Sequence, residues 1–176
     1  MALNIPFVND PTPRTFLKML NLEASQLSLP ESDQLMKGAL AAYVLLQAIA
    51  QFFSHGLIVS VFYGVSSGIV LFAATRSLLR YLGQEQKFVK TLTAMAVMGA
   101  VAALAYILLH LIVGVALPPP LPTERLARFL LFPIIVWTAF MYAFLLRHVS
   151  LRPIPAFFTA TLYVLMIEVV LSSINF

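Results

Sequence analysis

Five long apolar runs, separated by short polar segments, constrain this chain more than any other feature. A helix needs about 20 consecutive apolar residues to cross the hydrocarbon of a bilayer. The runs predict such helices over about 35–53, 57–79, 91–117, 129–146 and 156–174. Because backbone polar groups in lipid must be satisfied within the segment, the expected fold is all-α. We therefore predict a five-span transmembrane domain over residues 31–176, preceded by a cytoplasmic amphipathic segment over residues 1–30.

The composition agrees with a surface that faces lipid. Hydrophobic residues make up 61% of the 176 residues and charged residues only 10%, whereas a soluble domain has about a quarter of its residues charged. Cysteine is absent, which excludes disulfides, thiolate metal sites and cysteine nucleophiles. The polar, proline-rich start of the chain does not resemble a cleavable signal peptide.

The N-terminal segment predicts an amphipathic helix over Arg14–Leu29, capped by Thr12 with Pro13 at its first position. A short helix of this kind either lies in the membrane interface or packs on the cytoplasmic loops. The expected apolar face consists of Leu17, Leu20, Ala24 and Leu27. The expected polar face consists of Arg14, Lys18, Asn21 and Ser25.

The basic residues predict how the spans are oriented, because cytoplasmic loops carry an excess of lysine and arginine. Two of the eleven, Arg125 and Arg128, fall on one side of the predicted membrane. The other nine fall on the opposite side, which is therefore expected to be cytoplasmic, with the C-terminus outside. These nine are Arg14, Lys18, Lys37, Arg76, Arg80, Lys87, Lys90, Arg147 and Arg152. The net charge of +4 thus indicates topology rather than nucleic-acid binding.

A polar site is predicted inside the membrane. Glu168 is the one acidic residue within a predicted span, and a charged carboxylate in hydrocarbon is costly, so it should face the bundle. A rise of 1.5 Å per residue places Glu168 in the outer half of the bilayer together with polar residues of other spans. We consider either a structural hydrogen-bond network or a proton- or ion-coupled site. The candidate residues are Glu168, Gln47, Gln51, His110 and Tyr63.

The sequence lacks the patterns of an enzyme or a metal protein. The three histidines, His55, His110 and His148, include no pair at the i, i+4 spacing of a helical zinc site. No glycine-rich loop precedes a helix to hold phosphate, and no nucleophile-and-base pair is indicated. We therefore expect no metal, no cofactor and no catalytic residues.

Small residues in the second and third spans predict close helix packing. Gly64 and Gly68 form a Gly-x-x-x-Gly pattern, and Gly99 stands four residues before Ala103. Small residues at this spacing let two helix backbones approach closely. The pattern is expected to pack these two spans together within one chain, or alternatively to join two copies of the chain.

Several short segments together carry a resemblance to one known family. They are the opening Asp10-Pro11-Thr12-Pro13-Arg14-Thr15-Phe16, Gly83 and Phe88 in the loop Tyr81–Leu92, Trp137, and the segment Arg147-His148-Val149. These segments resemble the Yip family of small polytopic membrane proteins, which has a similar entry helix and a similar glycine-to-phenylalanine segment at the same place.

The resemblance implies five spans with a cytoplasmic N-terminus, and it implies no catalytic residues. Eukaryotic members are linked to vesicle trafficking and Rab GTPases, whereas the short loops of this chain resemble bacterial members. We expect a non-enzymatic protein of the bacterial inner membrane that binds lipid or a membrane-protein partner, as a subunit or by self-association. The alternative is a transporter or channel component that uses the polar site around Glu168.

Overall fold

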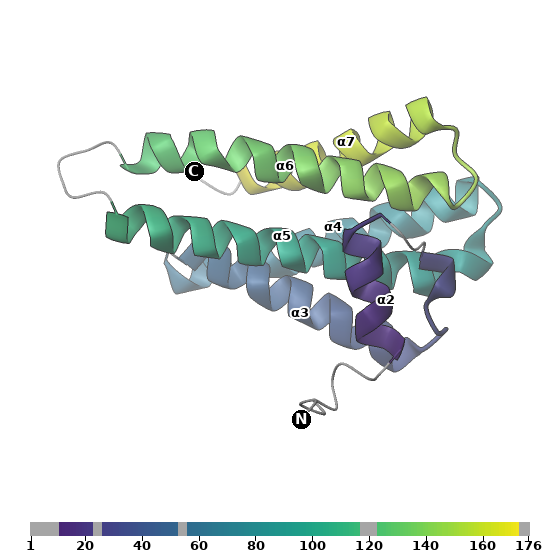
Figure 1. Cartoon of the computed structure of the whole chain (residues 1–176). Coiled ribbons are helices and arrows are strands. Elements are labelled where there is room, and N and C mark those ends of the chain that lie inside the picture. Colours follow the sequence, from purple (N-terminus) through teal and green to yellow (C-terminus); the bar gives the residue numbers. More distant parts are fainter. Residues whose placement is uncertain (1–10, 23–25, 53–55, 117–122, 173–176) are drawn as a thin grey trace, which may run out of the picture.

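The computed structural model describes residues 11–22, 26–52, 56–116 and 123–172. This part of the chain is helical and contains no strand (Figure 1). Five long helices follow a short N-terminal helix and are joined by short connections. In chain order the elements are α2 (Pro11–Leu20), η1 (Gln26–Ser28), α3 (Asp33–Phe52), α4 (Leu57–Tyr81), η2 (Glu85–Lys87), α5 (Phe88–Ala116), α6 (Thr123–Arg147) and α7 (Pro153–Ser172).

The five long helices occupy the five segments whose hydropathy predicts spans. The main difference is at α6, which begins at Thr123 rather than near residue 129 and continues through Pro133. The predicted span ends at residues 53, 117 and 174 lie outside the described residues, as do Ser54, His55 and the run of three prolines from Pro118.

Three of these helices, α3, α4 and α5, are long and apolar enough to cross a membrane. In α6 and α7 the described apolar stretches, Phe132–Arg147 and Pro153–Ile167, are shorter than 18 residues. Large apolar side chains also face outward: Ile58 is 85% exposed and Phe158 69% exposed. Such surfaces indicate a membrane protein, while the count of five spans stays a prediction.

Helix ends follow local sequence signals. The Ser32 hydroxyl accepts a hydrogen bond of 3.3 Å from the Leu35 amide at the start of α3, as an N-cap residue does. After α4, Gly83 has a φ of +66°. The Gly83 amide donates to the Arg80 oxygen (3.1 Å) and the Gln84 amide to the Leu79 oxygen (2.8 Å). This is a Schellman motif, which favours glycine at its left-handed position.

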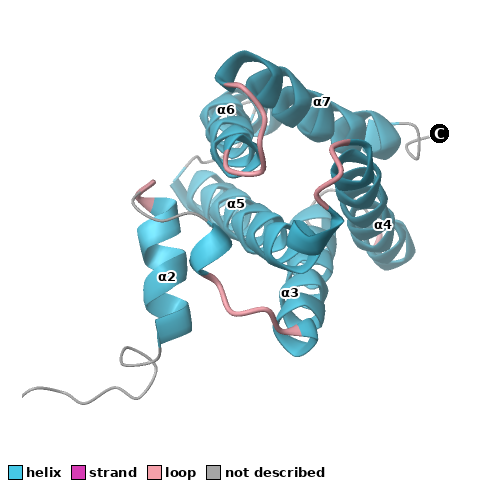
Figure 2. Ribbon diagram, turned by 90° about the vertical axis from the view of Figure 1, so that its right-hand side faces the viewer, coloured by secondary structure: helices cyan, strands magenta, loops and turns pink. Residues whose placement is uncertain are grey.

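Helix α5 is the central helix of the bundle (Figure 2). It contacts α3, α4 and α6, and α7 packs mainly on α6. Between Thr91 and Ala103 all but two residues of α5 are buried. The core therefore gathers around this half of α5, where fully buried side chains include Leu92, Met95, Met98, Tyr43, Tyr142 and Leu145.

The N-terminal helix is shorter than the sequence predicts. It begins at Pro11 and ends at Leu20, so the predicted extent of Arg14–Leu29 is wrong. Leu22 takes a left-handed φ of 61°, a conformation that cannot continue a right-handed helix. Ala24 and Ser25 of the predicted faces lie outside the described residues.

Only part of the predicted apolar face of α2 packs on the bundle, because Leu20 packs against the core while Leu17 faces outward. Met19 is fully buried, whereas Leu17 is 61% exposed. Helix α2 contacts α5 and lies across the bundle rather than along it (Figure 1). Packing on the helices is thus observed, and placement in a membrane interface stays a prediction.

Candidate functional site

The predicted polar residues lie on four helices of the bundle. Gln47 and Gln51 are half-buried on α3, Tyr63 is buried on α4, and His110 is half-buried on α5. Tyr63 packs against Ile167 of α7, the residue next to Glu168. The ring of His110 lies 5.8 Å, centroid to centroid, from that of Tyr106 in the preceding turn.

Glu168 itself belongs to α7, but its side chain lies outside the part of the structure that is described. The contact between Tyr63 and Ile167 brings α4 and α7 together beside it. A shared polar centre with Gln47, Gln51 and His110 stays a prediction.

Gly64 and Gly68 lie at the contact of α4 with α3. A Cβ atom added to Gly64 would collide with the Val44 backbone oxygen and would lie 3.0 Å from the Ala48 Cβ. A Cβ atom on Gly68 would lie 2.5 Å from a Val44 methyl group. The glycine pattern therefore faces the first long helix, α3, rather than α5.

Gly99 lies on α5 beneath two tyrosines. A Cβ atom there would lie 2.6 Å from the Tyr142 hydroxyl of α6 and 2.6 Å from Cε2 of Tyr43 on α3. Both tyrosines are 1% exposed. Gly99 thus leaves the space in which these side chains from different helices meet.

A third tyrosine joins this group. Tyr163 of α7 is 4% exposed and belongs to the same buried core as Tyr43 and Tyr142. The Tyr163 phenol also lies beside Thr75 of α4, although no hydrogen bond of regular length reaches its oxygen. We call Tyr43, Tyr142 and Tyr163 the tyrosine centre, which links α3, α6 and α7.

The chemistry of the tyrosine centre is that of packing. Thr75 directs its hydroxyl to the Met95 sulfur at 3.7 Å, a weak acceptor. Phenols keep their protons at neutral pH because their ordinary pKa is about 10, and a thioether is not a base. Sequence reasoning missed Tyr142 and Tyr163. The one available signal was the small residue Gly99, which indicates a bulky neighbour.

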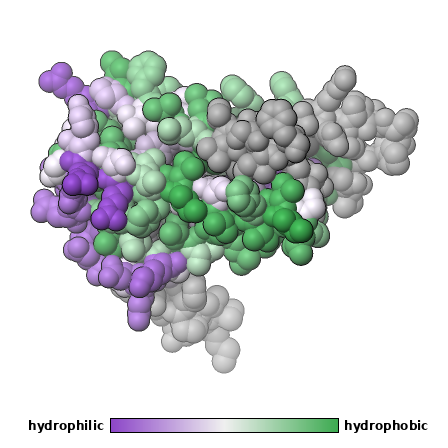
Figure 3. Space-filling model, turned by 180° about the vertical axis from the view of Figure 1, so that it is seen from behind, coloured by the Kyte–Doolittle hydropathy of each residue, from purple (hydrophilic) through white to green (hydrophobic). Residues whose placement is uncertain are grey.

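Charge gathers at one end of the bundle. On the face that Figure 3 shows, hydrophilic residues gather at that end and apolar residues along the described part of the body. The end holds the start of α3, α5 and α7 and the close of α4 and α6 (Figure 1). We call it the basic end. It carries Arg14, Lys18, Lys37, Arg76, Arg80, Lys87, Lys90, Arg147 and Arg152.

Few acidic side chains offset these cations in the described structure. Arg80 pairs with Glu85 at 3.6 Å across exposed side chains, an arrangement that contributes little to stability. Glu31 and Asp33 are also exposed near this end. The described residues contain no group of three or more histidine, aspartate or glutamate side chains that could hold a metal ion.

A buried glutamine fixes the N-terminal segment to the basic end. The Gln26 side-chain nitrogen donates a hydrogen bond of 2.6 Å to the Leu145 backbone oxygen in the last turn of α6. Gln26 and the nearby Leu29 are fully or almost fully buried. From the sequence this stretch is expected to be the end of an amphipathic helix over Arg14–Leu29, and neither of the two predicted faces includes Gln26.

No protein-family model, curated protein or solved structure matches this chain.

Proposed function

We propose that the chain is a non-enzymatic, Yip-like protein of a bacterial inner membrane, with five spans, which binds lipid or a membrane-protein partner at its basic end. One observation supports this most strongly. Nine of the eleven lysine and arginine residues lie at one end of a bundle whose described helices are mainly apolar, and the N-terminal segment is fixed there.

The clustering of charge also supports a cytoplasmic basic end. Lysine and arginine near the ends of membrane helices favour the cytoplasmic side. Helices α6 and α7 have 25 and 20 residues, and about 20 residues are enough to cross the hydrocarbon. With five crossings the N-terminus lies inside and the C-terminus outside.

Exposed apolar residues beside the cations support a role at the membrane surface. Leu17, Leu22 and Leu27 are 61%, 50% and 41% exposed, close in sequence to the exposed Arg14 and Lys18. Leucines inserted among headgroups together with neighbouring cations are typical of interfacial segments. In this proposal one side of α2 packs on the bundle while Leu17 enters the interface.

The family resemblance gives additional support at two residues. Gly83 occupies the left-handed position that ends α4. Phe88 begins α5 and packs edge-on against Phe72, with ring centroids 5.2 Å apart. These residues shape the loop of the basic end. The tyrosine centre, whose chemistry is packing, accords with a protein that binds rather than catalyses.

Site-specific photo-crosslinking tests the proposed function. The chain contains no cysteine, so a single Gln86→Cys can carry a crosslinker on the exposed loop of the basic end. A matched Gly56→Cys lies at the opposite end, where an added side chain has open space. In living membranes we expect discrete adducts with lipid or one membrane protein from position 86 only. Absence of adducts there, or the same adducts from both positions, would contradict binding at the basic end.

A further inference from the structure

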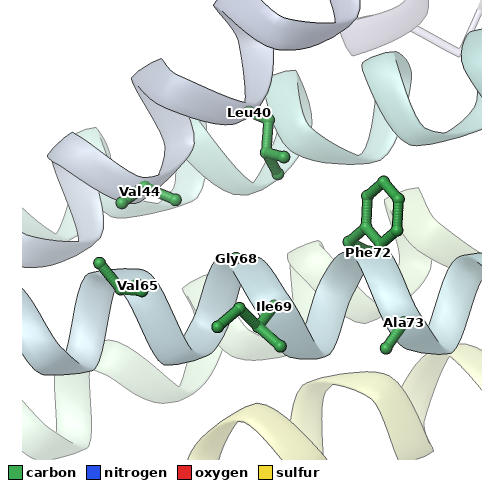
Figure 4. Close-up of a pocket in the computed structure, with 7 residues that line it drawn as sticks. All are labelled: Leu40, Val44, Val65, Gly68, Ile69, Phe72 and Ala73. Atoms are coloured by element: carbon green, nitrogen blue, oxygen red, sulfur yellow. The ribbon is translucent and has the colours of Figure 1, made fainter.

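An apolar groove opens between α3 and α4 on the outside of the bundle (Figure 4). Its volume is about 290 Å³, close to the lower limit of roughly 300 Å³ for small-molecule sites. The two helices approach closely at Gly64, and Figure 4 shows α3 rising away from α4 toward Leu40 and Phe72. Leu40 and Val44 line one wall, and α4 residues that include Gly68, Ile69, Phe72 and Ala73 line the other.

The shape of the groove is held by neighbouring contacts. Val44 closes it against Gly68, where even a methyl group would collide. Phe72 is supported from behind by its edge-on contact with Phe88 of α5. The lining of the groove is almost wholly apolar. Inside a bilayer such a groove faces hydrocarbon, so the matching occupant is an acyl chain.

Two cations stand where the groove reaches the basic end. Lys37 lies one turn before Leu40 on α3, and Arg76 lies one turn after Phe72 on α4. Residues three or four apart share a helix face, and the two helices run in opposite directions (Figure 1). Lys37 and Arg76 therefore flank the same opening, and both are exposed.

The neighbouring charges leave this opening cationic. Asp33 lies one turn before Lys37 and is exposed. Arg80, one turn beyond Arg76, is joined to Glu85. Long basic side chains can extend along a helix to the headgroup level. An apolar groove that ends between two cations is complementary in shape and charge to an anionic phospholipid.

We propose that an anionic phospholipid binds here, with one acyl chain between α3 and α4 and its phosphate between Lys37 and Arg76. The inference rests on the proposed membrane-spanning arrangement and names the lipid that its basic end selects. A lysine or arginine near anionic headgroups contributes about 1 kcal/mol, which is about five-fold in binding. Two such residues give a preference on the order of 20-fold over a zwitterionic lipid.

Quenching in vesicles tests the proposal. The variant Ala73→Cys carries a bimane fluorophore in the groove, and Leu162→Cys carries it at a similar distance from the basic end on the exposed face of α7. Each protein is reconstituted in phosphatidylcholine containing either spin-labelled phosphatidylglycerol or spin-labelled phosphatidylcholine. At position 73 we expect phosphatidylglycerol to quench the fluorophore at a mole fraction roughly ten- to 20-fold lower than phosphatidylcholine does. At position 162 we expect no such difference.

Charge variants separate a built site from general attraction. Lys37→Gln with Arg76→Gln should abolish the lipid preference at position 73. The control double variant, Lys18→Gln with Arg147→Gln, removes the same amount of charge elsewhere on the basic end and should preserve the lipid preference at position 73. Equal quenching by both lipids at position 73, or equal losses in both double variants, would overturn the lipid site. Absence of quenching at both label positions would instead contradict the membrane-spanning arrangement itself.

Discussion

The side chain of Gln26 donates a hydrogen bond of 2.6 Å to the backbone oxygen of Leu145, a residue 119 positions later in the chain. The same oxygen accepts the His148 amide at 3.1 Å. Gln26 is fully buried, so the contact is shielded from water and joins the N-terminal segment to the end of α6. Near it, Met19 and Leu29 extend the hydrophobic core beneath the basic end.

Replacing Gln26 should therefore loosen the N-terminal segment. Gln26→Ala removes the buried hydrogen bond and leaves a gap, for which we expect a loss of about 1–3 kcal/mol in the free energy of unfolding. SDS-induced unfolding in mixed micelles measures that loss, and limited proteolysis should cut before residue 30 sooner than in the parent. Gln34→Ala, on the exposed surface of α3, is the matched control. Equal behaviour of the two variants would show that the Gln26 contact is unimportant.

Two glycine-to-alanine changes should have opposite effects on stability. Gly64→Ala places a methyl group against the Val44 backbone, so the α3–α4 pair must separate, at about 1–3 kcal/mol. Gly38→Ala on α3 meets open space and should stabilise by up to about 1 kcal/mol, because alanine favours a helix. SDS-induced unfolding of both variants in the same mixed micelles measures the two changes in stability. A neutral Gly64→Ala would contradict the close contact of α3 with α4.

The tyrosine centre predicts coupling between Gly99 and Tyr142. Gly99→Ala alone should destabilise the bundle by about 1–3 kcal/mol, since its methyl group meets the Tyr142 hydroxyl and the Tyr43 ring. Tyr142→Phe removes that hydroxyl and should recover part of the loss. A double-mutant cycle should then give an interaction energy of about 0.5–2 kcal/mol. Strict additivity of the two changes would exclude contact between these groups.

The long helices could be predicted from the sequence because hydropathy and helix signals are local. Asp33 in the first turn of α3 and Gly83 after α4 are recognisable without tertiary information. The common end of the nine basic residues was likewise predictable, since each lies in the N-terminal segment, in a loop beside an apolar run, or near the matching end of such a run. These features depend on near neighbours along the chain.

The pairing of helices could not be predicted in this way. Gly64 signals close approach, but nothing in its neighbours names α3 as the partner. Tyr43, Tyr142 and Tyr163 meet only because three helices converge on them. The premature end of α2 at Leu20 accompanies the burial of Gln26, a long-range contact that overrides the periodicity expected to continue to Leu29.

A conservative change at Glu168 separates the binding function from the alternative of a transporter. If the protein binds rather than transports, reconstituted vesicles with a pH-sensitive dye should show no protein-dependent proton flux, with or without Glu168→Gln. The free energy of unfolding should change by less than about 1 kcal/mol and the helical content should be preserved, since glutamine preserves the shape and hydrogen bonding of a carboxyl group. Flux in the parent that Glu168→Gln abolishes would support a proton-coupled site and contradict a purely binding role.

The arrangement of α6 and α7 in the membrane is the central claim, and Ser150→Cys tests it directly. Ser150 is exposed between these helices, and the cysteine-free chain makes it the single target of a membrane-impermeant maleimide. Gly56→Cys and Gln86→Cys serve as external and internal references. Five spans predict that position 150 resists labelling in intact cells and reacts only after permeabilisation, as position 86 does. Labelling of position 150 in intact cells, together with position 56, would mean that only α3, α4 and α5 cross the membrane.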